Sequence, residues 1–176
     1  MAASSFLTPR RCLSFIRESR SGRAMPDIRK YRPTDFEQLW KLDQTCFPAD
    51  IAYSRNELAY YLAAPRALCF VVEDHNEPVA FILGHQQRGN VGHIVTLDVV
   101  PQAQRKRLGS VLMEKLESSF VELGCSSLML EVAVSNLAAL TFYKKHGFTV
   151  IKTLRHYYPG GLDGLLMGKK LSRETA

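Results

Sequence analysis

Residues 95–116, VTLDVVPQAQRKRLGSVLMEKL, join a strand pattern to a helix pattern through a short basic turn. Apolar residues alternate in the first part, and Pro101 ends the strand because proline lacks the N–H group that a sheet needs. Apolar residues recur at helical spacing in the second part, which predicts a helix over about 107–123 that Gly124 ends. A strand that runs through a basic turn into a helix is one way to build an anion site.

The turn itself combines positive charge with a glycine at the start of the helix. Its residues are Gln104, Arg105, Lys106, Arg107, Leu108, Gly109 and Ser110. A helix N-terminus presents unpaired N–H groups and a positive dipole end, and glycine lets a phosphate approach the backbone closely. Two interpretations remain open at this point, a phosphate site and a solvated basic turn. The glycine fingerprints of dinucleotide and nucleoside-triphosphate loops are both absent, which disfavours those folds.

The charge of the chain is concentrated at its beginning. Residues 1–24 hold five arginines and one glutamate, a net +4, so residues 25–176 carry only +2 of the total of +6. A net charge this small does not indicate a basic face for nucleic acid. The longest apolar run, residues 67–72, is far too short to span a bilayer. We therefore expect neither a nucleic-acid partner nor a membrane partner.

The cysteines and histidines do not indicate a metal site. The four cysteines are scattered without a C-x-x-C pair, and the five histidines are dispersed as well. Neither pattern has the spacing of zinc ligands, and neither predicts a disulfide framework. We expect no metal and a reducing compartment, which favours a cytoplasmic protein.

Residues 1–24 differ in composition from the rest of the chain. They are rich in arginine and serine and nearly free of acidic residues, a composition that resembles an organelle transit peptide. A disordered tail and a mis-assigned start, with Met25 as the true beginning, are the other interpretations. All three place this segment outside the folded domain, which we expect to span residues 25–176.

From residue 27 onward, strand and helix patterns alternate. Strands are expected over 27–32, 67–74, 78–86, 92–100, 126–134, 148–154 and 162–170. Thr34 with Glu37, and Ser54 with Glu57, have capping-box spacing and predict two helices before the second strand, the latter running to about Ala64. Asn136 is expected to cap the last helix, over 137–146. The order β-α-α-β-β-β-α-β-α-β-β predicts an α/β fold with a mixed sheet flanked by helices.

Two of these stretches resemble a known family. Residues 95–116 resemble the acetyl-CoA motif of the GNAT acyltransferase superfamily, Q/R-x-x-G-x-G/A, and residues 130–148, LEVAVSNLAALTFYKKHGF, resemble its second diagnostic segment. The second segment and residues 156–171, HYYPGGLDGLLMGKKL, are most similar to the RimI-type ribosomal-protein alanine N-terminal acetyltransferases. The resemblance covers residues 27–171 and implies a single GNAT-like domain with a largely antiparallel sheet.

The resemblance also implies an activity. It implies transfer of an acetyl group from acetyl-CoA to an amine, in first place the N-terminal α-amine of a protein or peptide, by a monomer or weak dimer. A small-molecule amine as acceptor, and a non-catalytic module that binds acyl-CoA, are the alternatives.

One residue departs from the family motif. Arg107 stands where the first motif glycine is expected. An arginine is tolerable there if the backbone has an ordinary helical φ, because its N–H can still face the diphosphate. Its side chain then either adds a charge-assisted contact to phosphate or crowds it.

Three residues are candidates for the chemistry. Glu131 lies inside the apolar strand LMLEVAV, where a carboxylate is costly unless it has a partner or faces a cleft. The matching glutamate is the general base in the RimI-type resemblance, although a polar-face glutamate would fit the pattern too. His93 is the rival, as a residue that relays protons through water or as a strand-end histidine. Tyr143 matches the family's general acid for the coenzyme A sulfur, and a core aromatic is the alternative.

The resemblance further implies residues on the two substrate sides. The backbone of Leu97, Asp98 and Val99 is expected to run beside the pantetheine arm, and Asn136 to contact coenzyme A as well as cap its helix. Two loops are expected to flank the acceptor. Their candidate residues are Phe47, Pro48, Tyr53, Tyr157 and Tyr158.

Overall fold

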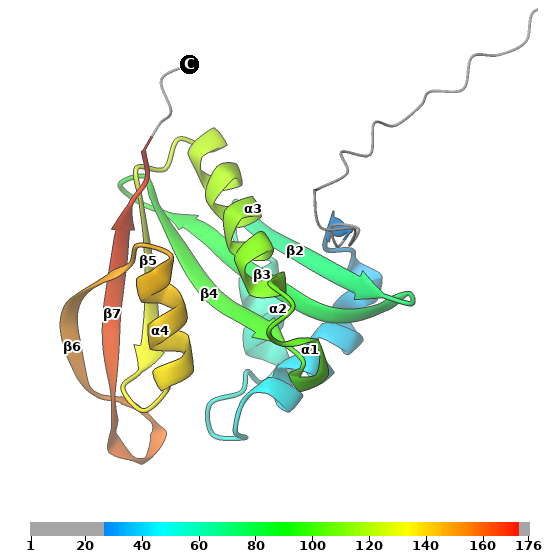
Figure 1. The fold of residues 1–176 in the computed structure, drawn as a ribbon, viewed down its shortest axis with the longest axis horizontal. Helices are drawn as coiled ribbons and strands as arrows, with labels where there is room; N and C mark the ends of the chain where they lie inside the picture. The colour runs from blue at the N-terminus through cyan, green and yellow to red at the C-terminus, as the bar shows by residue number, and fades with distance from the viewer. Residues whose placement is uncertain (1–26, 173–176) are drawn as a thin grey trace, which may run out of the picture.

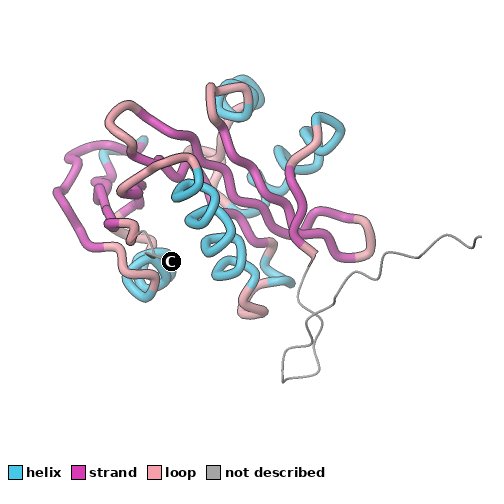
Figure 2. The backbone as a smooth tube through the Cα atoms, turned by 90° about the horizontal axis from the view of Figure 1, so that it is seen from above, coloured by secondary structure: helices cyan, strands magenta, loops and turns pink. Residues whose placement is uncertain are grey.

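The computed structural model describes residues 27–172 and consists of one mixed sheet between two layers of helices (Figures 1 and 2). Seven strands follow in the spatial order β1-β2-β3-β4-β5-β7-β6. Their bounds are β1 Ile28–Lys30, β2 Ala67–Asp74, β3 Glu77–Gln87, β4 Val91–Val99, β5 Ser127–Ala133, β6 Thr149–Tyr158 and β7 Leu162–Lys170. Every neighbouring pair is antiparallel except β4 and β5. The predicted segment 1–24 lies outside the described residues.

Four α-helices cover the sheet. Their bounds are α1 Phe36–Cys46, α2 Arg55–Leu62, α3 Leu108–Glu122 and α4 Leu137–Lys145. Figure 2 shows α3 and α4 on one face of the sheet and α1 and α2 on the other. Within residues 27–172 none of these helices combines the length and the apolar character that crossing a bilayer requires. The arrangement gives the three-layer α/β architecture that the order of elements predicts.

The parallel contact between β4 and β5 is short and divides the sheet into two parts. Only Val91, Gly92 and His93 pair with β5, opposite residues 127–129. Beyond His93 the two strands diverge, as Figure 1 shows, and each keeps its antiparallel neighbour on the other side. The pairing of β4 with β3 also skips Val95, which is a β-bulge at the point of divergence. The divergence therefore leaves a row of backbone groups of β4 without a strand partner.

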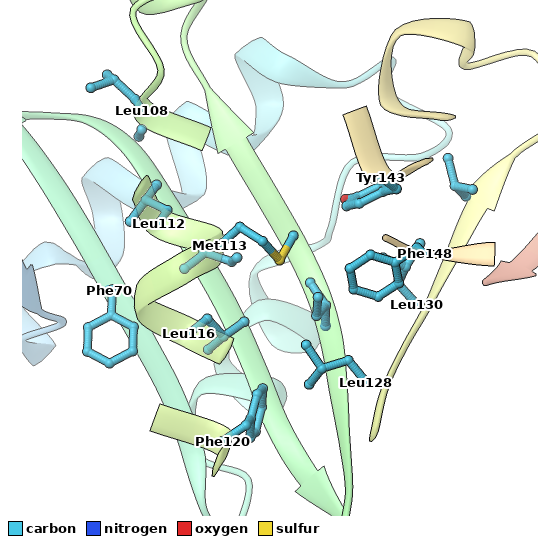
Figure 3. Packing of buried hydrophobic residues seen from close by; sticks show 14 of the residues in the cluster. Phe70, Leu108, Leu112, Met113, Leu116, Phe120, Leu128, Leu130, Tyr143 and Phe148 are labelled. Atoms are coloured by element: carbon cyan, nitrogen blue, oxygen red, sulfur yellow. The ribbon is translucent and has the colours of Figure 1, made fainter. Parts of the chain in front are cut away.

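Each face of the sheet has its own apolar core. The apolar side of α3, including Leu112, Leu116 and Phe120, packs against β2, β3 and β4, as Figure 3 shows, and all three side chains are fully buried. On the opposite face, Leu39 and Leu58 of α1 and α2 pack in a second cluster with buried residues of β2 and β3. Burial of such aliphatic and aromatic side chains is the main stabilising contribution to the fold. The first core contains buried residues of both β4 and β5 and so holds the two diverging strands in place.

The elements expected from sequence are all present, in the expected order. The expected cap at Thr34 is wrong, because a short 3₁₀ helix over Pro33–Asp35 precedes α1 and the Asp35 carboxylate instead accepts the Arg32 N–H. Ser54 does cap α2, with the reciprocal bond from its N–H to Glu57. The strand expected near 148–154 continues to Tyr158, so its tyrosines end a strand.

Candidate active site

A hydrogen-bonded pair of side chains joins β4 to β5 at the point where their pairing ends. His93 is the last paired residue of β4, and its Nε2 lies 2.7 Å from the Oε2 atom of Glu131 on β5. Both side chains are mostly buried but keep some exposure, 14% for His93 and 22% for Glu131. The sequence presents these two residues as alternatives for the base, whereas in the structure they form one hydrogen-bonded unit. A carboxylate held by an imidazole in this way is equipped to accept a proton and pass it on.

Below this pair, the unpaired edge of β4 offers backbone donors to a ligand. The Val100 N–H donates to Val79 on β3, so the alternation along a strand turns the N–H groups of Val99 and Leu97 to the other side, into the gap before β5. The Gln104 amide donates to the Val99 carbonyl in the same gap, at 3.1 Å. Such an unpaired edge suits an amide-bearing chain that lies along it.

A cavity of about 530 Å³ lies between this edge, the N-terminus of α3 and α4. Most of the residues expected on the cofactor side line it, namely Leu97, Val99, Gln104, Arg105, Arg107, Leu108, Gly109, Ser110, Asn136 and Tyr143. Lys106 and Asp98 do not. The first turn of α3 therefore faces this cavity with its free N–H groups, and arginines flank it, which favours a phosphate-bearing ligand.

Arg107 does not have the ordinary helical backbone that its side chain would favour. Its φ and ψ are 66° and 8°, in the left-handed region, and Arg105 also has a positive φ of 59°. The condition under which an arginine fits without strain, a helical φ, is therefore not met: this turn keeps the conformation that a glycine adopts readily, and an arginine holds it against steric resistance. Glycine suits this position because it adopts a positive φ without steric cost, and the sequence motif alone does not show that the position needs a positive φ.

A second cavity, of about 300 Å³, lies on the other side of the gap. The loop after α1 contributes Phe47, Pro48 and Ile51 to it, and the sheet contributes Glu131 and Tyr158. Its lining is thus mainly apolar with one carboxylate.

Tyr143 lines both cavities and so lies at their junction. Its ring packs edge-on against Phe148, with the centroids 5.7 Å apart, at the end of the apolar core (Figure 3). Burial raises the pKa of Tyr143 well above its usual value, so the phenol stays protonated at neutral pH. A phenol at this junction can donate a proton to the leaving group of a reaction between ligands in the two cavities.

Two of the tyrosines expected on the acceptor side lie apart from this second cavity. Tyr53 packs in the core beneath α1 and α2, and its hydroxyl donates to the Val95 carbonyl, at 3.2 Å. Tyr157 is half exposed and stacks edge-on against Tyr158, with the centroids 5.0 Å apart. Burial raises the pKa of Tyr157 and of Tyr158, and the nearby Glu131 carboxylate adds to both shifts.

Several residues of the site carried no signal that sequence analysis used. Cys46 lines both cavities, and its position directly before Phe47 was the available hint. His85 on β3 lies opposite His93, with the ring centroids 5.4 Å apart, and Tyr61 of α2 follows at 6.0 Å. Cross-strand register brings the two histidine rings together, and this register is not readable from a single strand pattern.

Two buried carboxylates lie behind the site and do not open into either cavity. Asp98 is 1% exposed and Asp43 is fully buried, and each has one oxygen without a hydrogen-bond partner among the described residues. Burial raises the pKa of Asp98 well above its ordinary value and that of Asp43 to about 6. Asp43 accepts the Tyr53 N–H at 2.8 Å, so it fixes the loop that leads to the second cavity.

The described part of the chain contains no group of three or more side chains that would hold a metal ion. The arrangement at the gap instead consists of a proton acceptor, a proton donor, unpaired backbone N–H groups and an anion-binding helix N-terminus. Together these are the groups that acyl transfer from a phosphate-bearing thioester to an amine requires.

Comparison with known proteins agrees with this geometry. The model of the Acetyltransferase (GNAT) family matches residues 36–148. The chain belongs to the GNAT acetyltransferase family. An N-alpha-acetyltransferase of Sulfurisphaera tokodaii is 32% identical over 156 residues, which cover 82% of this chain and 92% of the relative.

Solved structures of GNAT proteins resemble the fold closely. The ribosomal-protein-S18-alanine N-acetyltransferase of Escherichia coli superposes with a TM-score of 0.76 at 26% identity, over 86% of this chain and 99% of the other. Ard1 of Thermoplasma volcanium also gives 0.76 at 26% identity, over 84% and 98%. The family and these relatives confirm the predicted fold class and an acetyl-CoA-dependent N-acetyltransferase.

Proposed function

We propose that this GNAT protein transfers the acetyl group of acetyl-CoA to the α-amine of a protein N-terminus. The observation that carries the proposal is the His93–Glu131 pair at the divergence of β4 and β5, with a phosphate-type cavity on one side and an apolar cavity on the other. The relatives whose names specify N-alpha-acetyltransferase activity support the α-amine as acceptor. The proposal assigns acetyl-CoA to the first cavity and the acceptor to the second.

The reaction requires only a neutral amine and a modest base on the acceptor side. A free α-amine has a reference pKa of about 7.7–8.0, so a useful fraction is neutral near pH 7.5. In the proposed mechanism the amine nitrogen attacks the thioester carbonyl, and its surplus proton passes to the Glu131 carboxylate, which His93 orients through the 2.7 Å hydrogen bond. The Leu97 N–H group faces the gap where the carbonyl oxygen gains negative charge.

The leaving group needs a proton when the carbon–sulfur bond breaks. In this proposal the Tyr143 phenol donates it to the coenzyme A sulfur, because this side chain lies at the junction of the cavities and stays protonated. The nucleotide end of the co-substrate is held by the free N–H groups of the first α3 turn and by Arg105 and Arg107. Asn136 caps α4 through the Ala139 N–H and lines the same cavity.

The finer assignment is a RimI-type enzyme that acts on ribosomal-protein alanine N-termini. The structural likeness to the Escherichia coli enzyme supports it, at 26% identity. A cytoplasmic location, a monomer or weak dimer, and the absence of nucleic-acid and membrane partners stay predictions from the sequence. So does the acceptor role of Tyr53 and Tyr157.

Coenzyme A release with two matched peptides tests the acceptor. The first peptide has a free alanine or serine N-terminus and blocked lysines, and the second has a blocked N-terminus and one free lysine. At pH 7.5–8 we expect turnover on the first peptide alone. A lysine ε-amine has a pKa of about 10.4 and needs far more help from a base.

Turnover on the lysine peptide alone would contradict the proposal. Turnover on neither peptide, with acetyl-CoA binding intact by calorimetry, would move the acceptor to a small-molecule amine. If the first peptide alone is acetylated, a scan of its first residue, with alanine against methionine and glutamate, tests the RimI-type assignment.

A further inference from the structure

His146 forms a side-chain hydrogen bond at the edge of the cofactor cavity, and the proposed chemistry does not use this bond. It caps the C-terminus of α4, and its Nε2 atom lies 3.0 Å from the Oγ atom of Ser110, the third residue of α3. Ser110 lines the 530 Å³ cavity, whereas His146 does not. The contact therefore reaches the ligand only through the serine.

An apolar contact accompanies this hydrogen bond and fixes the imidazole ring. The ring lies against Phe142, one turn earlier on α4, with the centroids 4.4 Å apart and the planes at 40°. Phe142 lines the cavity, and a Cβ added to Gly109 would lie 3.4 Å from its ring. The C-terminal turn of α4 and the first turn of α3 are thus in contact through one polar and one apolar pair.

The hydrogen bond decides what the serine can offer to an anion. A serine hydroxyl has one proton to donate. If Nε2 accepts that proton, the hydroxyl presents only lone pairs to the cavity. If Nε2 carries a proton and donates it to Oγ, the hydroxyl proton is free to point at a phosphate oxygen, beside the free N–H groups of the α3 terminus.

We propose that His146 is a positioning residue for the diphosphate of acetyl-CoA. Its Nε2–H donates to Ser110 Oγ, and the Ser110 O–H then donates to a phosphate oxygen. Burial lowers the pKa of His146, so the ring is neutral at pH 7.5 and adopts the tautomer with the proton on Nε2 when the anion binds. This inference rests only on the acetyl-CoA part of the proposed function and not on the acceptor.

Four variants separate a positioning role from a packing role. His146→Phe keeps a flat ring against Phe142 and removes the donor. His146→Gln places an amide nitrogen near the position of Nε2, whereas His146→Asn, of the same chemistry, is too short to reach Ser110. Ser110→Ala removes the relayed hydroxyl, and Ser118→Ala is its control on the same helix, because the Ser118 hydroxyl bonds only the Lys115 carbonyl.

Binding of coenzyme A is measured by calorimetry without any acceptor. We expect Kd to rise about three- to tenfold for His146→Phe, His146→Asn and Ser110→Ala, the effect of one lost hydrogen bond of typical strength. His146→Gln and Ser118→Ala should stay within about twofold of the parent protein. The double variant His146→Phe/Ser110→Ala should lose no more than either single change, because the two residues act in series.

Steady-state kinetics give the second readout. We expect a higher KM for acetyl-CoA with an unchanged kcat, and no change in KM for acetylpantetheine, which lacks the diphosphate. An unaltered Kd for His146→Phe would overturn the proposal, as would an equal loss for acetylpantetheine or additive losses in the double variant. Because binding needs no acceptor, such a result leaves the α-amine proposal untouched, and failure of the peptide assay leaves this one untouched.

Discussion

At the scale of single residues, the hydrogen bond between His93 and Glu131 turns two separate candidates into one functional unit. The two side chains lie 38 residues apart in sequence and 2.7 Å apart in space. A glutamate in an apolar strand and a histidine at a strand end each have ordinary structural explanations. Their contact at the divergence of β4 and β5 is what favours a catalytic role, and only the parallel register of three residue pairs reveals it.

The catalytic roles predict two clear losses of turnover. Glu131→Ala removes the proton acceptor and Tyr143→Phe removes the donor, so each should lower kcat on the order of 10²-fold or more. Circular dichroism and urea unfolding check that the fold survives. Tyr143→Phe with full turnover would mean that solvent protonates the leaving thiolate. Phe148→Leu, at a ring that packs on Tyr143 and lines neither cavity, serves as the comparison for packing effects.

The backbone of Arg107 gives a prediction of the opposite kind. A left-handed φ destabilises the folded state by about 1–2 kcal/mol for a residue with a side chain, and glycine avoids this cost. Glycine also makes the unfolded chain more flexible, which lowers the stability of the fold by about 0.5–1 kcal/mol. We therefore expect Arg107→Gly to raise the free energy of unfolding by up to about 1 kcal/mol. Acetyl-CoA affinity should change less than tenfold, since the N–H remains. A larger change in calorimetric titration would give the guanidinium a decisive role in binding.

At the scale of elements, capping residues and apolar periodicity predict most of the helices and strands of the fold. Ser54 and Asn136 each cap the helix that their position predicts, and the apolar stripe of residues 107–123 is the buried side of α3. The predicted Thr34 cap is wrong because the next residue, Asp35, accepts the backbone N–H of Arg32 and forms an ion pair with Arg29. Local patterns do not distinguish two adjacent residues that are both suited to a cap.

The arrangement of the elements relative to one another was beyond sequence reasoning. Spatial order places β7 between β5 and β6, and it is long-range pairing that decides this. The register of β3 and β4 places His85 opposite His93, and the packing of α2 on the sheet places Tyr61 beside His85 and Tyr53 in the core. The resemblance indicated which residues to consider for the site, but the distances between them depend on strand register.

The cap of α2 allows a test of how far this helix supports the acceptor side. Ser54→Ala removes the bond from the Glu57 N–H and should lower the free energy of unfolding by about 1 kcal/mol. Because α2 follows the loop that lines the acceptor cavity, we also expect a higher KM for the peptide and an unchanged KM for acetyl-CoA. Urea unfolding and two-substrate kinetics measure both. Equal changes in the two KM values would show that the helix supports the whole site.

At the scale of the whole molecule, the buried acids make stability depend on pH. The pKa of Asp98 is higher in the fold than in the unfolded chain, so folding takes up a proton there. Asp98 therefore lowers the free energy of unfolding as pH rises above its pKa in the unfolded chain, near 3.9. This loss of stability grows until the pH reaches the pKa of Asp98 in the folded protein. Asp35, Glu57 and Glu73 have lowered pKa values and act in the opposite direction, at lower pH.

Asp98→Asn isolates this contribution, because an amide resembles the neutral carboxyl and can still accept the Thr96 hydroxyl. We expect the variant to gain stability relative to the parent protein as pH rises from 5 to 8, by at most about 1.4 kcal/mol per pH unit. Urea unfolding at three pH values measures the difference. A constant difference would show that the pKa of Asp98 is the same in the folded and unfolded chains.

The divergence of β4 and β5 also bears on self-association. An unpaired strand edge on a surface is a hazard, because the sheet of another molecule can extend it and begin an aggregate. Here the free edge of β4 lies inside its own sheet, with α3 and α4 on one side and the loop after α1 on the other. At the surface these unpaired backbone groups would favour aggregation. Inside the sheet they are accessible to a narrow ligand but not to a strand of another protein.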